Sequence, residues 1–162
     1  MKRSRPISAL LFALLLASAF VQCQELTVQT DSGKQVLLNR TDLEALQHVK
    51  VSAKEHSSDK VTFEGVTIKS VLEKAGVTFG ESMKGKRLTN CLLVEAADGY
   101  RAVIALPELD SAFTDRLTVL AFLRNGKPLG EKEGPYRIVI PDEKRMARWV
   151  RQVTTLKIVD VQ

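Results

Sequence analysis

The chain holds few of the residues from which metal centres and disulfides are built. Its 162 residues include two cysteines, Cys23 and Cys91, and two histidines, His48 and His56. A metal site needs three or four convergent ligands, and two isolated histidines do not supply them. Because Cys23 falls at the end of an N-terminal apolar segment, the rest of the chain has no pair for an intrachain disulfide. The domain must therefore be stabilised by its hydrophobic core.

Several catalytic sequence patterns are also missing. The chain has no P-loop and no GxGxxG sequence, and Gly126, Gly130 and Gly134 are spaced as loop residues. No Ser/His/Asp order and no paired-carboxylate signature occurs. These absences argue against the common nucleotide-binding motifs and against a serine-hydrolase site.

The N-terminus has the composition of an export signal. Lys2, Arg3 and Arg5 precede an apolar run from Ile7 to Val21. A basic start before about fifteen apolar residues is typical of a secretory signal peptide and is short for a membrane span. We predict residues 1–23 as a signal peptide and residues 24–162 as an exported domain, periplasmic or secreted, with no membrane span after cleavage.

Other interpretations of this N-terminus stay open. Ala17-Ser18-Ala19 is a second candidate cleavage site, and the segment would serve as an anchor if it were not cleaved. Cys23 is a candidate lipidation site, but Gln22 is bulky where such sites prefer a small residue.

Removal of residues 1–23 changes the charge balance. It takes away three basic residues and no acidic ones, which leaves 21 Lys and Arg against 19 Asp and Glu, a net charge of +2. The sequence pI near 9.3 thus arises partly from the signal segment. We expect no nucleic-acid partner, because such partners require a strongly basic surface.

Short apolar runs bounded by Gly, Pro, Asn and Asp predict roughly seven or eight β-strands. Asp98-Gly99 and Asn125-Gly126 are typical hairpin turns. We expect one α+β domain, mixed and mostly β, with two or three short helices. The expected strand runs are Leu26–Thr30, Lys34–Leu38, His48–Ala53, Val61–Phe63, Leu88–Ala97, Tyr100–Leu106, Leu117–Leu123, Tyr136–Ile140 and Leu156–Val161.

Two helices have start signals. Thr41 and Glu44 have the spacing of a capping box for a short first helix. Thr67 precedes a second helix, Ile68–Ala75, whose apolar residues lie on one face, and Gly76 is expected to end it with a left-handed conformation.

Several single residues carry local predictions. Gly65 is expected to turn the chain, and Cys91 to be a small buried residue in a strand. Trp149, the only tryptophan, is expected in the core with a partner for its indole N–H. Tyr100 is expected on a strand face near a pocket mouth.

Three segments carry a family resemblance. Their order and spacing resemble the molybdopterin-binding domain of the sulfite-oxidase type of oxidoreductases, over nearly the whole exported domain. The segments are Phe63-Glu64-Gly65-Val66 with the helix after it, Ala97-Asp98-Gly99-Tyr100 leading into Ala105–Leu109, and the series Leu120–Phe122, Asn125–Leu129, Gly134–Pro141 and Arg148–Val150.

The resemblance implies a domain that holds a molybdenum cofactor by its pterin, with a cysteine thiolate on the metal. That cysteine belongs at the end of the strand corresponding to Val49–Ala53, but this sequence has no cysteine between Val49 and Lys60. A thiolate is a soft, charged donor that neither a hydroxyl nor an imidazole replaces simply. The usual redox mechanism therefore lacks its metal ligand here, and whether the chain is an enzyme stays open.

The same resemblance implies that basic residues of the third segment contact the phosphate and pterin of the cofactor. Arg145–Val150 is expected to form a short helical turn. If the whole segment from Lys144 to Arg151 is helical, Lys144, Arg148 and Arg151 share one face and Arg145 lies beside it. The alternative is a solvated basic face. The cofactor-binding candidates are Arg137, Lys144, Arg145 and Arg148, with His56 at the cofactor edge.

Two functions follow from these observations. The first is an exported domain that binds a molybdopterin-type anionic ligand. The second is a non-catalytic periplasmic binding module that uses the same scaffold for another small ligand or for a protein partner. The first predicts a pocket between the basic 137–151 segment and the loop at 51–58.

Overall fold

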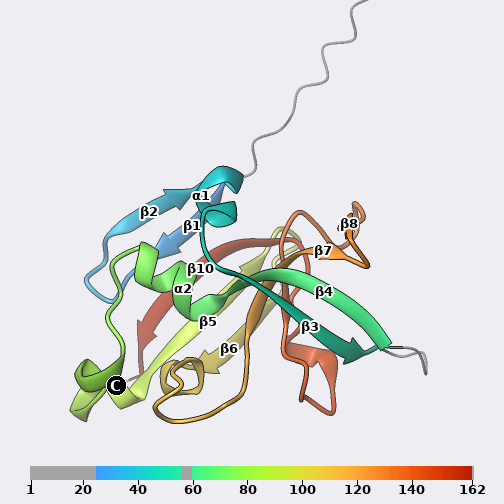
Figure 1. Ribbon diagram of the computed structural model, residues 1–162. Helices are drawn as coiled ribbons and strands as arrows, with labels where there is room; N and C mark the ends of the chain where they lie inside the picture. The colour runs from blue at the N-terminus through green and yellow to red at the C-terminus, as the bar shows by residue number, and fades with distance from the viewer. Residues whose placement is uncertain (1–24, 56–59, 162) are drawn as a thin grey trace, which may run out of the picture.

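Two five-stranded sheets form the body of the protein (Figure 1). The structure, a computed structural model, describes residues 25–55 and 60–161. The first sheet has the order β2-β1-β10-β5-β6, and the second has the order β3-β4-β7-β8 with β9 also paired to β7. The strands are β1 (Leu26–Gln29), β2 (Gln35–Leu38), β3 (His48–Lys54), β4 (Lys60–Thr67), β5 (Asn90–Ala96), β6 (Arg101–Ala105), β7 (Val119–Arg124), β8 (Lys127–Pro128), β9 (Arg137–Val139) and β10 (Val153–Asp160).

The mostly β, α+β architecture predicted from the sequence is confirmed, with ten strands in the described part where roughly seven or eight were expected from nine candidate runs. Each of these runs overlaps a described strand, and the two-residue β8 is the strand that no run predicted. Among the described strands, β1 and β10 pair in parallel and the other ladders are antiparallel. Strand faces alternate between buried and more exposed residues, as in β5, so that one face of each sheet contributes to a shared core.

The helices are short and lie over the core. Helix α1 (Arg40–Glu44) buries Leu43, and helix α2 (Ile68–Lys74) buries an apolar face that includes Leu72. The Thr67 hydroxyl accepts a hydrogen bond from the Ser70 N–H, so the predicted start of α2 is confirmed. Three 3₁₀ turns link the strands between α2 and β7: η1 (Gly80–Ser82), η2 (Gly85–Thr89) and η3 (Leu106–Leu109).

The predicted cap of the first helix was wrong by two residues. Asn39, not Thr41, is the N-cap, and its side chain accepts from the Asp42 N–H while the Asp42 carboxylate accepts from the Asn39 N–H. Both pairs have capping-box spacing, and Asn and Asp can form the same reciprocal bonds as Thr and Glu. The sequence therefore contains two overlapping capping-box patterns, Asn39/Asp42 and Thr41/Glu44, and the structure forms the first of them.

Gly65 lies within β4 and does not turn the chain, which corrects the prediction for this residue. It pairs with Val49 on β3 and with Ala121 on β7. A Cβ placed on Gly65 would lie 2.0 Å from the Leu120 carbonyl oxygen. Glycine is required here because two backbones approach closely at a shift in register.

The segment after β9 is irregular apart from one 3₁₀ turn, η4 (Met146–Arg148). The short helical turn expected at Arg145–Val150 is present as η4, but the segment from Lys144 to Arg151 is not a continuous helix, so its basic residues do not share one helical face. Trp149 is buried and its indole N–H donates to the Ile140 carbonyl at 3.1 Å, as predicted. This bond closes the 141–148 loop on itself.

Asp110 ties α2 to the loops that follow it. Its carboxylate accepts from Lys69 Nζ at 3.0 Å and from the Gly80 N–H at 2.6 Å. Burial raises the pKa of Asp110, but the N–H groups of Gly80 and Ala112 and the Lys69 ammonium outweigh burial and hold the pKa below its usual value. The carboxylate is therefore ionised at neutral pH.

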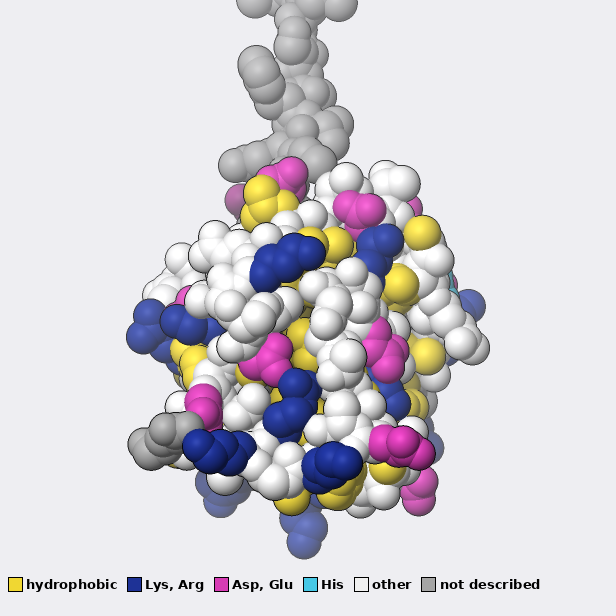
Figure 2. All heavy atoms as spheres, turned by 90° about the vertical axis from the view of Figure 1, so that its left-hand side faces the viewer, with side chains coloured by type: hydrophobic (Ala, Val, Ile, Leu, Met, Phe, Trp, Pro, Cys, Tyr) yellow, Lys and Arg dark blue, Asp and Glu magenta, His cyan; other side chains and the backbone are white. Residues whose placement is uncertain are grey.

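Charges of both signs are mixed on the molecular surface. On the face that Figure 2 shows, Lys and Arg side chains are interspersed with Asp and Glu side chains and do not form a single basic patch. Within residues 25–55 and 60–161, no helix has the length and apolar character needed to span a membrane.

Candidate anion-binding groove

A groove of about 580 Å³ lies between the end of the β3–β4 hairpin and the 141–146 loop. Figure 1 shows this loop, coloured orange-red, beside the ends of β3 and β4. The hairpin contributes Ser52–Glu55 and Lys60, and the loop contributes Pro141–Lys144 and Met146. The first functional hypothesis requires the end of the hairpin to lie near the basic segment. The structure places the two on opposite walls of one groove.

Three lysines give the groove a positive character. Lys54 and Lys60 are directly opposite each other in the last pair of the β3–β4 ladder, and Lys144 lines the groove from the loop. All three side chains are exposed and make no ion pair with any described residue. Like charges directly opposite each other destabilise a strand pair. The described walls of the groove therefore carry three positive charges that no described carboxylate compensates.

A buried charge cluster lies at the same end of the hairpin. Arg137 is 1% exposed and its guanidinium pairs with Glu55 at 2.8 Å and with Glu133 at 3.0 Å. Arg124 pairs with the same two carboxylates, at 3.3 Å from Glu133. The two positive and two negative charges balance within the cluster. Arg137 is consequently neutralised by the protein itself, and Glu55 adds no free negative charge to the groove.

Arg137 also packs on aromatic rings. Its guanidinium carbon lies 5.2 Å from the centre of the Phe63 ring and 5.5 Å from that of Trp149. Its Nε–H is buried and has no acceptor among the described residues. A buried N–H without an acceptor costs about 1–3 kcal/mol. The carboxylates of the cluster thus leave one hydrogen-bond donor of Arg137 unsatisfied.

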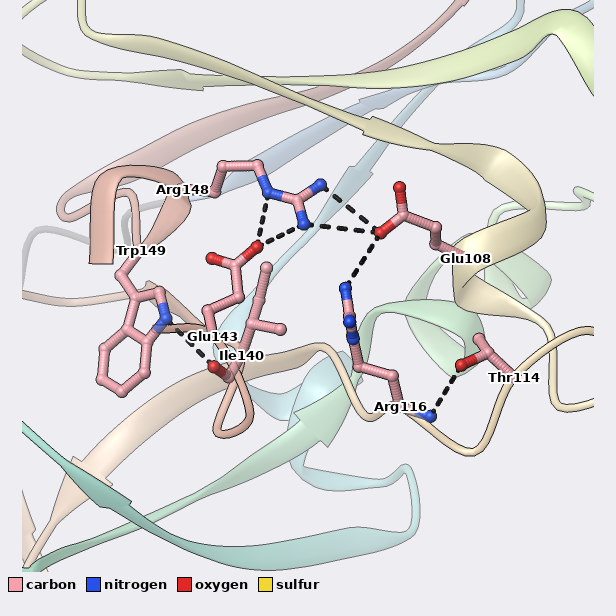
Figure 3. Close-up of polar contacts among 7 residues, drawn as sticks. All are labelled: Glu108, Thr114, Arg116, Ile140, Glu143, Arg148 and Trp149. Atoms are coloured by element: carbon pink, nitrogen blue, oxygen red, sulfur yellow. Dashed lines mark hydrogen bonds and ion pairs between the residues drawn. The ribbon is translucent and has the colours of Figure 1, made fainter. Parts of the chain in front are cut away.

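Arg148 forms a second charge network (Figure 3). Its Nε donates to Glu143 at 2.6 Å, and its NH groups lie 3.4 Å from Glu108, which also pairs with Arg116 at 3.5 Å. Burial lowers the pKa of Arg148, but the hydrogen bond to Glu143 and the charges of Glu108 and Glu143 outweigh it, so its pKa is raised. Arg148 therefore stays charged, and its charge is compensated locally.

Glu143 links this network to the groove. One of its oxygens accepts from Arg148, while the other is buried without a hydrogen-bond partner in the described part of the chain. In Figure 3 this second oxygen points away from Arg148 and Glu108. With Glu55 and Glu143 both paired to arginines, Asp142 is the one groove carboxylate that makes no ion pair with a described residue. Three unpaired lysines against one such carboxylate leave the groove positive.

The four described residues that were predicted to bind the cofactor do not form one site. Lys144 lines the groove, and Arg145 is exposed in an adjoining depression of about 520 Å³ that Lys144 also lines. Arg137 and Arg148 are held by carboxylates instead of facing solvent. His56 lies outside the described residues.

A second cavity of about 250 Å³ lies behind the η4 turn, with Met146 in the walls of both the cavity and the groove. Tyr100 lines the cavity, and its hydroxyl donates to the Ala147 carbonyl at 2.7 Å. Tyr100 thus lies at a cavity, as predicted, but it precedes β6 and is not on a strand face. We call this space the Trp149 cavity; its lining residues are Asp98, Tyr100, Arg137, Met146, Ala147, Trp149, Val150 and Arg151.

The described residues do not fit a thiolate-held metal. At the end of β3, where the resemblance places a cysteine, the chain has Ser52, Ala53, Lys54 and Glu55. Cys91 lies on β5 in the other sheet, and its Sγ is 3.8 Å from the Thr89 carbonyl. Cys91 lies in a strand, as predicted, but it is half-buried where a buried residue was expected. No group of three or more His, Cys, Asp or Glu residues within the described ranges has the arrangement of a metal site.

Sequence reasoning missed the acidic half of both networks. Glu55, Glu133 and Glu143 each lie in a polar loop or turn with no periodic pattern. Glu55 pairs with residues that are distant in sequence, whereas Glu133 is four residues from Arg137 and Glu143 is five residues from Arg148. No regular helix brings these nearer pairs together, so no periodic pattern marks them. The surplus of arginines near the third family segment was the available signal, because a buried arginine requires a carboxylate partner.

Comparisons with known proteins agree with this architecture. The family model described as "Oxidoreductase molybdopterin binding domain" matches residues 21–162. Among solved structures, the chain is similar to the sulfane dehydrogenase SoxCD from Paracoccus pantotrophus, with a TM-score of 0.63 and 20% sequence identity. The match covers 85% of this chain and 38% of the SoxCD chain. A search of curated proteins found no match. The predicted sulfite-oxidase type of molybdopterin-binding fold is confirmed.

Proposed function

The chain belongs to the oxidoreductase molybdopterin-binding domain family, and on that premise we propose that it binds a phosphate-bearing, pterin-type ligand in the groove between the β3–β4 hairpin and the 141–146 loop. The proposed binding does not involve a protein thiolate on a metal. We further propose that the domain acts outside the cytoplasm, after removal of residues 1–23.

The cross-strand pair of Lys54 and Lys60 is the observation that carries this proposal. The two ammonium groups repel each other in the free protein, and Lys144 adds a third charge on the opposite wall. A phosphate brought among them relieves that repulsion and accepts charge-assisted hydrogen bonds. Lysine suits this role because its ammonium group acts as a compact point charge with three donors.

The remaining polar groups suit a ligand with N–H donors. The second oxygen of Glu143, a groove residue, is a buried acceptor without a partner in the described structure. The pyrimidinone edge of a pterin carries N–H groups that can donate to a carboxylate oxygen. The phosphate of such a molecule would meet the lysines, and a ring N–H would reach this Glu143 oxygen once the side chain turns toward the groove, because the oxygen has no exposed surface in the described conformation.

Oxo transfer at a thiolate-bound metal is not part of the proposal. The hydroxyl of Ser52, the methyl group of Ala53 and the ion-paired carboxylate of Glu55 occupy the end of the hairpin strand. None of them is the soft, charged donor that tunes such a metal. We therefore assign this chain a binding role and derive no redox step.

A charge-removal experiment tests the groove. In the double variant Lys54→Gln/Lys60→Gln, the affinity for a 6-substituted pterin monophosphate, followed by its own fluorescence, is expected to fall at least about tenfold. The loss of charge-assisted bonds of about 1.5–3 kcal/mol each accounts for this size. The stability of the variant is expected not to fall, because the substitutions remove a repulsion between like charges.

The matched control is Lys34→Gln/Lys132→Gln, which removes two charges from exposed positions outside the groove. It should bind the pterin monophosphate as the unaltered protein does. If both double variants lose affinity equally, binding depends on net charge alone and the groove assignment is wrong. If the unaltered protein does not bind the pterin monophosphate, the alternative of a different small ligand or a protein partner replaces the proposal.

A further inference from the structure

A separate cavity of about 300 Å³ lies between the start of α2 and the segment that precedes β7. Thr67, the cap of α2, and Lys69 line it on one side, and the other lining residues belong to the segment 109–118. Thr67 and Lys60 are the two ends of β4, so this cavity and the groove lie at opposite ends of that strand. We call this space the α2 cavity, and the proposed function makes no use of it.

Two basic side chains line the α2 cavity, and each is paired with a carboxylate of the protein. The Lys69 Nζ donates to Asp110 at 3.0 Å, and Asp110 is 1% exposed. Figure 3 shows the Arg116 guanidinium directed at Glu108, to which it lies at 3.5 Å. Neither basic group is therefore an uncompensated charge in the wall.

Asp115 is the charged wall residue that has no such compensation. It is exposed, lines the cavity and makes no ion pair with a described residue. The network of Arg116 contains two arginines and two glutamates, and the pair of Lys69 and Asp110 is neutral. The charged groups in and behind the wall thus sum to one negative charge, which favours a cation in the cavity.

Hydroxyl groups and apolar side chains form other parts of the wall. The Thr114 hydroxyl accepts from the Arg116 N–H at 3.1 Å, which holds it in place (Figure 3), and Thr118 is 5% exposed. Leu109 and Leu117 contribute apolar surface. Hydroxyl oxygens can accept hydrogen bonds from an ammonium group, and apolar surface suits a hydrocarbon body.

We propose that the α2 cavity binds a small organic ammonium ion, with its charged nitrogen at Asp115 and its hydrocarbon body against Leu109 and Leu117. A volume of about 300 Å³ is at the lower end for small-molecule sites, which suits a molecule of one ring. An ammonium group carries three N–H donors. The Asp115 carboxylate and the cavity hydroxyls supply their acceptors.

Benzylammonium is the probe that tests this site, titrated by calorimetry into the full exported chain. Saturable binding of one equivalent is expected. Because Asp115 is exposed, Asp115→Asn is expected to weaken this binding about fivefold, the upper limit for an exposed ion pair. Leu117 is 44% exposed, and Leu117→Lys is expected to abolish the binding by placing a like charge in the wall. Neutral benzyl alcohol should bind the unaltered protein and Asp115→Asn equally.

Glu131→Gln is the matched control, because Glu131 is also exposed, makes no ion pair with a described residue and does not line the cavity. It should leave benzylammonium affinity unchanged. No saturable binding, full affinity in Asp115→Asn, or an equal loss in the Asp115 and Glu131 variants would overturn the proposal. The Lys54→Gln/Lys60→Gln variant should still bind benzylammonium, so failure of the groove and failure of the α2 cavity give different results.

Discussion

Replacement of Arg137 by alanine is expected to lower the free energy of unfolding by about 3–5 kcal/mol, the usual cost of removing one partner from a buried ion pair. Arg137 is 1% exposed and lies between Glu55 and Glu133. Without it, two carboxylates would share the single charge of Arg124. Lost packing against Phe63 and Trp149 adds to the effect. Urea unfolding followed by circular dichroism measures the change.

Arg101→Ala provides the comparison for Arg137→Ala. Arg101 also pairs with a glutamate, Glu95, at 2.8 Å, but its side chain is largely exposed. Exposed ion pairs contribute at most about 1 kcal/mol. Similar small losses in both variants would show that the Arg137 cluster is not a buried, interdependent unit.

The variant Gly65→Ala is expected to lose about 3 kcal/mol or more of unfolding free energy, at the upper end of the cost of overpacking. The new methyl group would lie 2.0 Å from the Leu120 carbonyl oxygen and 2.7 Å from the Ala121 Cα. Both atoms belong to the backbone of β7, so no side chain can rotate away to make space. The β4–β7 ladder would have to separate at its centre.

Gly130→Ala is the matched control, because no atom lies within 4 Å of a Cβ at Gly130. This change should alter stability by less than about 1 kcal/mol in either direction. If Gly65→Ala is as stable as Gly130→Ala, then β4 and β7 do not approach each other as closely as described. Thermal unfolding of the two variants under the same conditions decides the matter.

Local signals in the sequence predicted much of the fold. The Asn125-Gly126 turn has positive φ at both residues, as its sequence indicates. The Thr67 cap and the apolar face of α2 are also local features, and both are observed. Trp149 was expected in the core because a sole large aromatic residue is seldom left exposed. Each of these predictions depends on residues within a few positions of one another.

Features that depend on distant segments were not predicted. Gly65 looked like a turn residue because the strand that requires its missing side chain, β7, is remote in sequence. The pattern after Pro141 predicted a short helical turn, and η4 is that turn, but the rest of the segment is a loop that the Trp149 indole bond to Ile140 closes. Periodicity reports only the faces of regular elements, and it is uninformative where a segment is fixed by tertiary contacts.

The candidate site was predicted only in part. Composition identified a basic segment, and the resemblance placed it near the end of the hairpin strand. The sequence did not indicate that Arg137 and Arg148 are neutralised by Glu55, Glu133 and Glu143. The charges left for a ligand are the lysines of the groove, two of which lie in the hairpin and were not among the predicted site residues.

The pterin content of the purified protein tests the central claim most directly. The full chain is produced in a host that makes molybdenum cofactor, and the exported domain is oxidised to release fluorescent pterin, with molybdenum measured by elemental analysis. The account predicts stoichiometric pterin in the unaltered protein, little in Lys54→Gln/Lys60→Gln, and no change of pterin or metal in Cys91→Ser. A well-folded protein without pterin, or loss of molybdenum on Cys91→Ser, would contradict it.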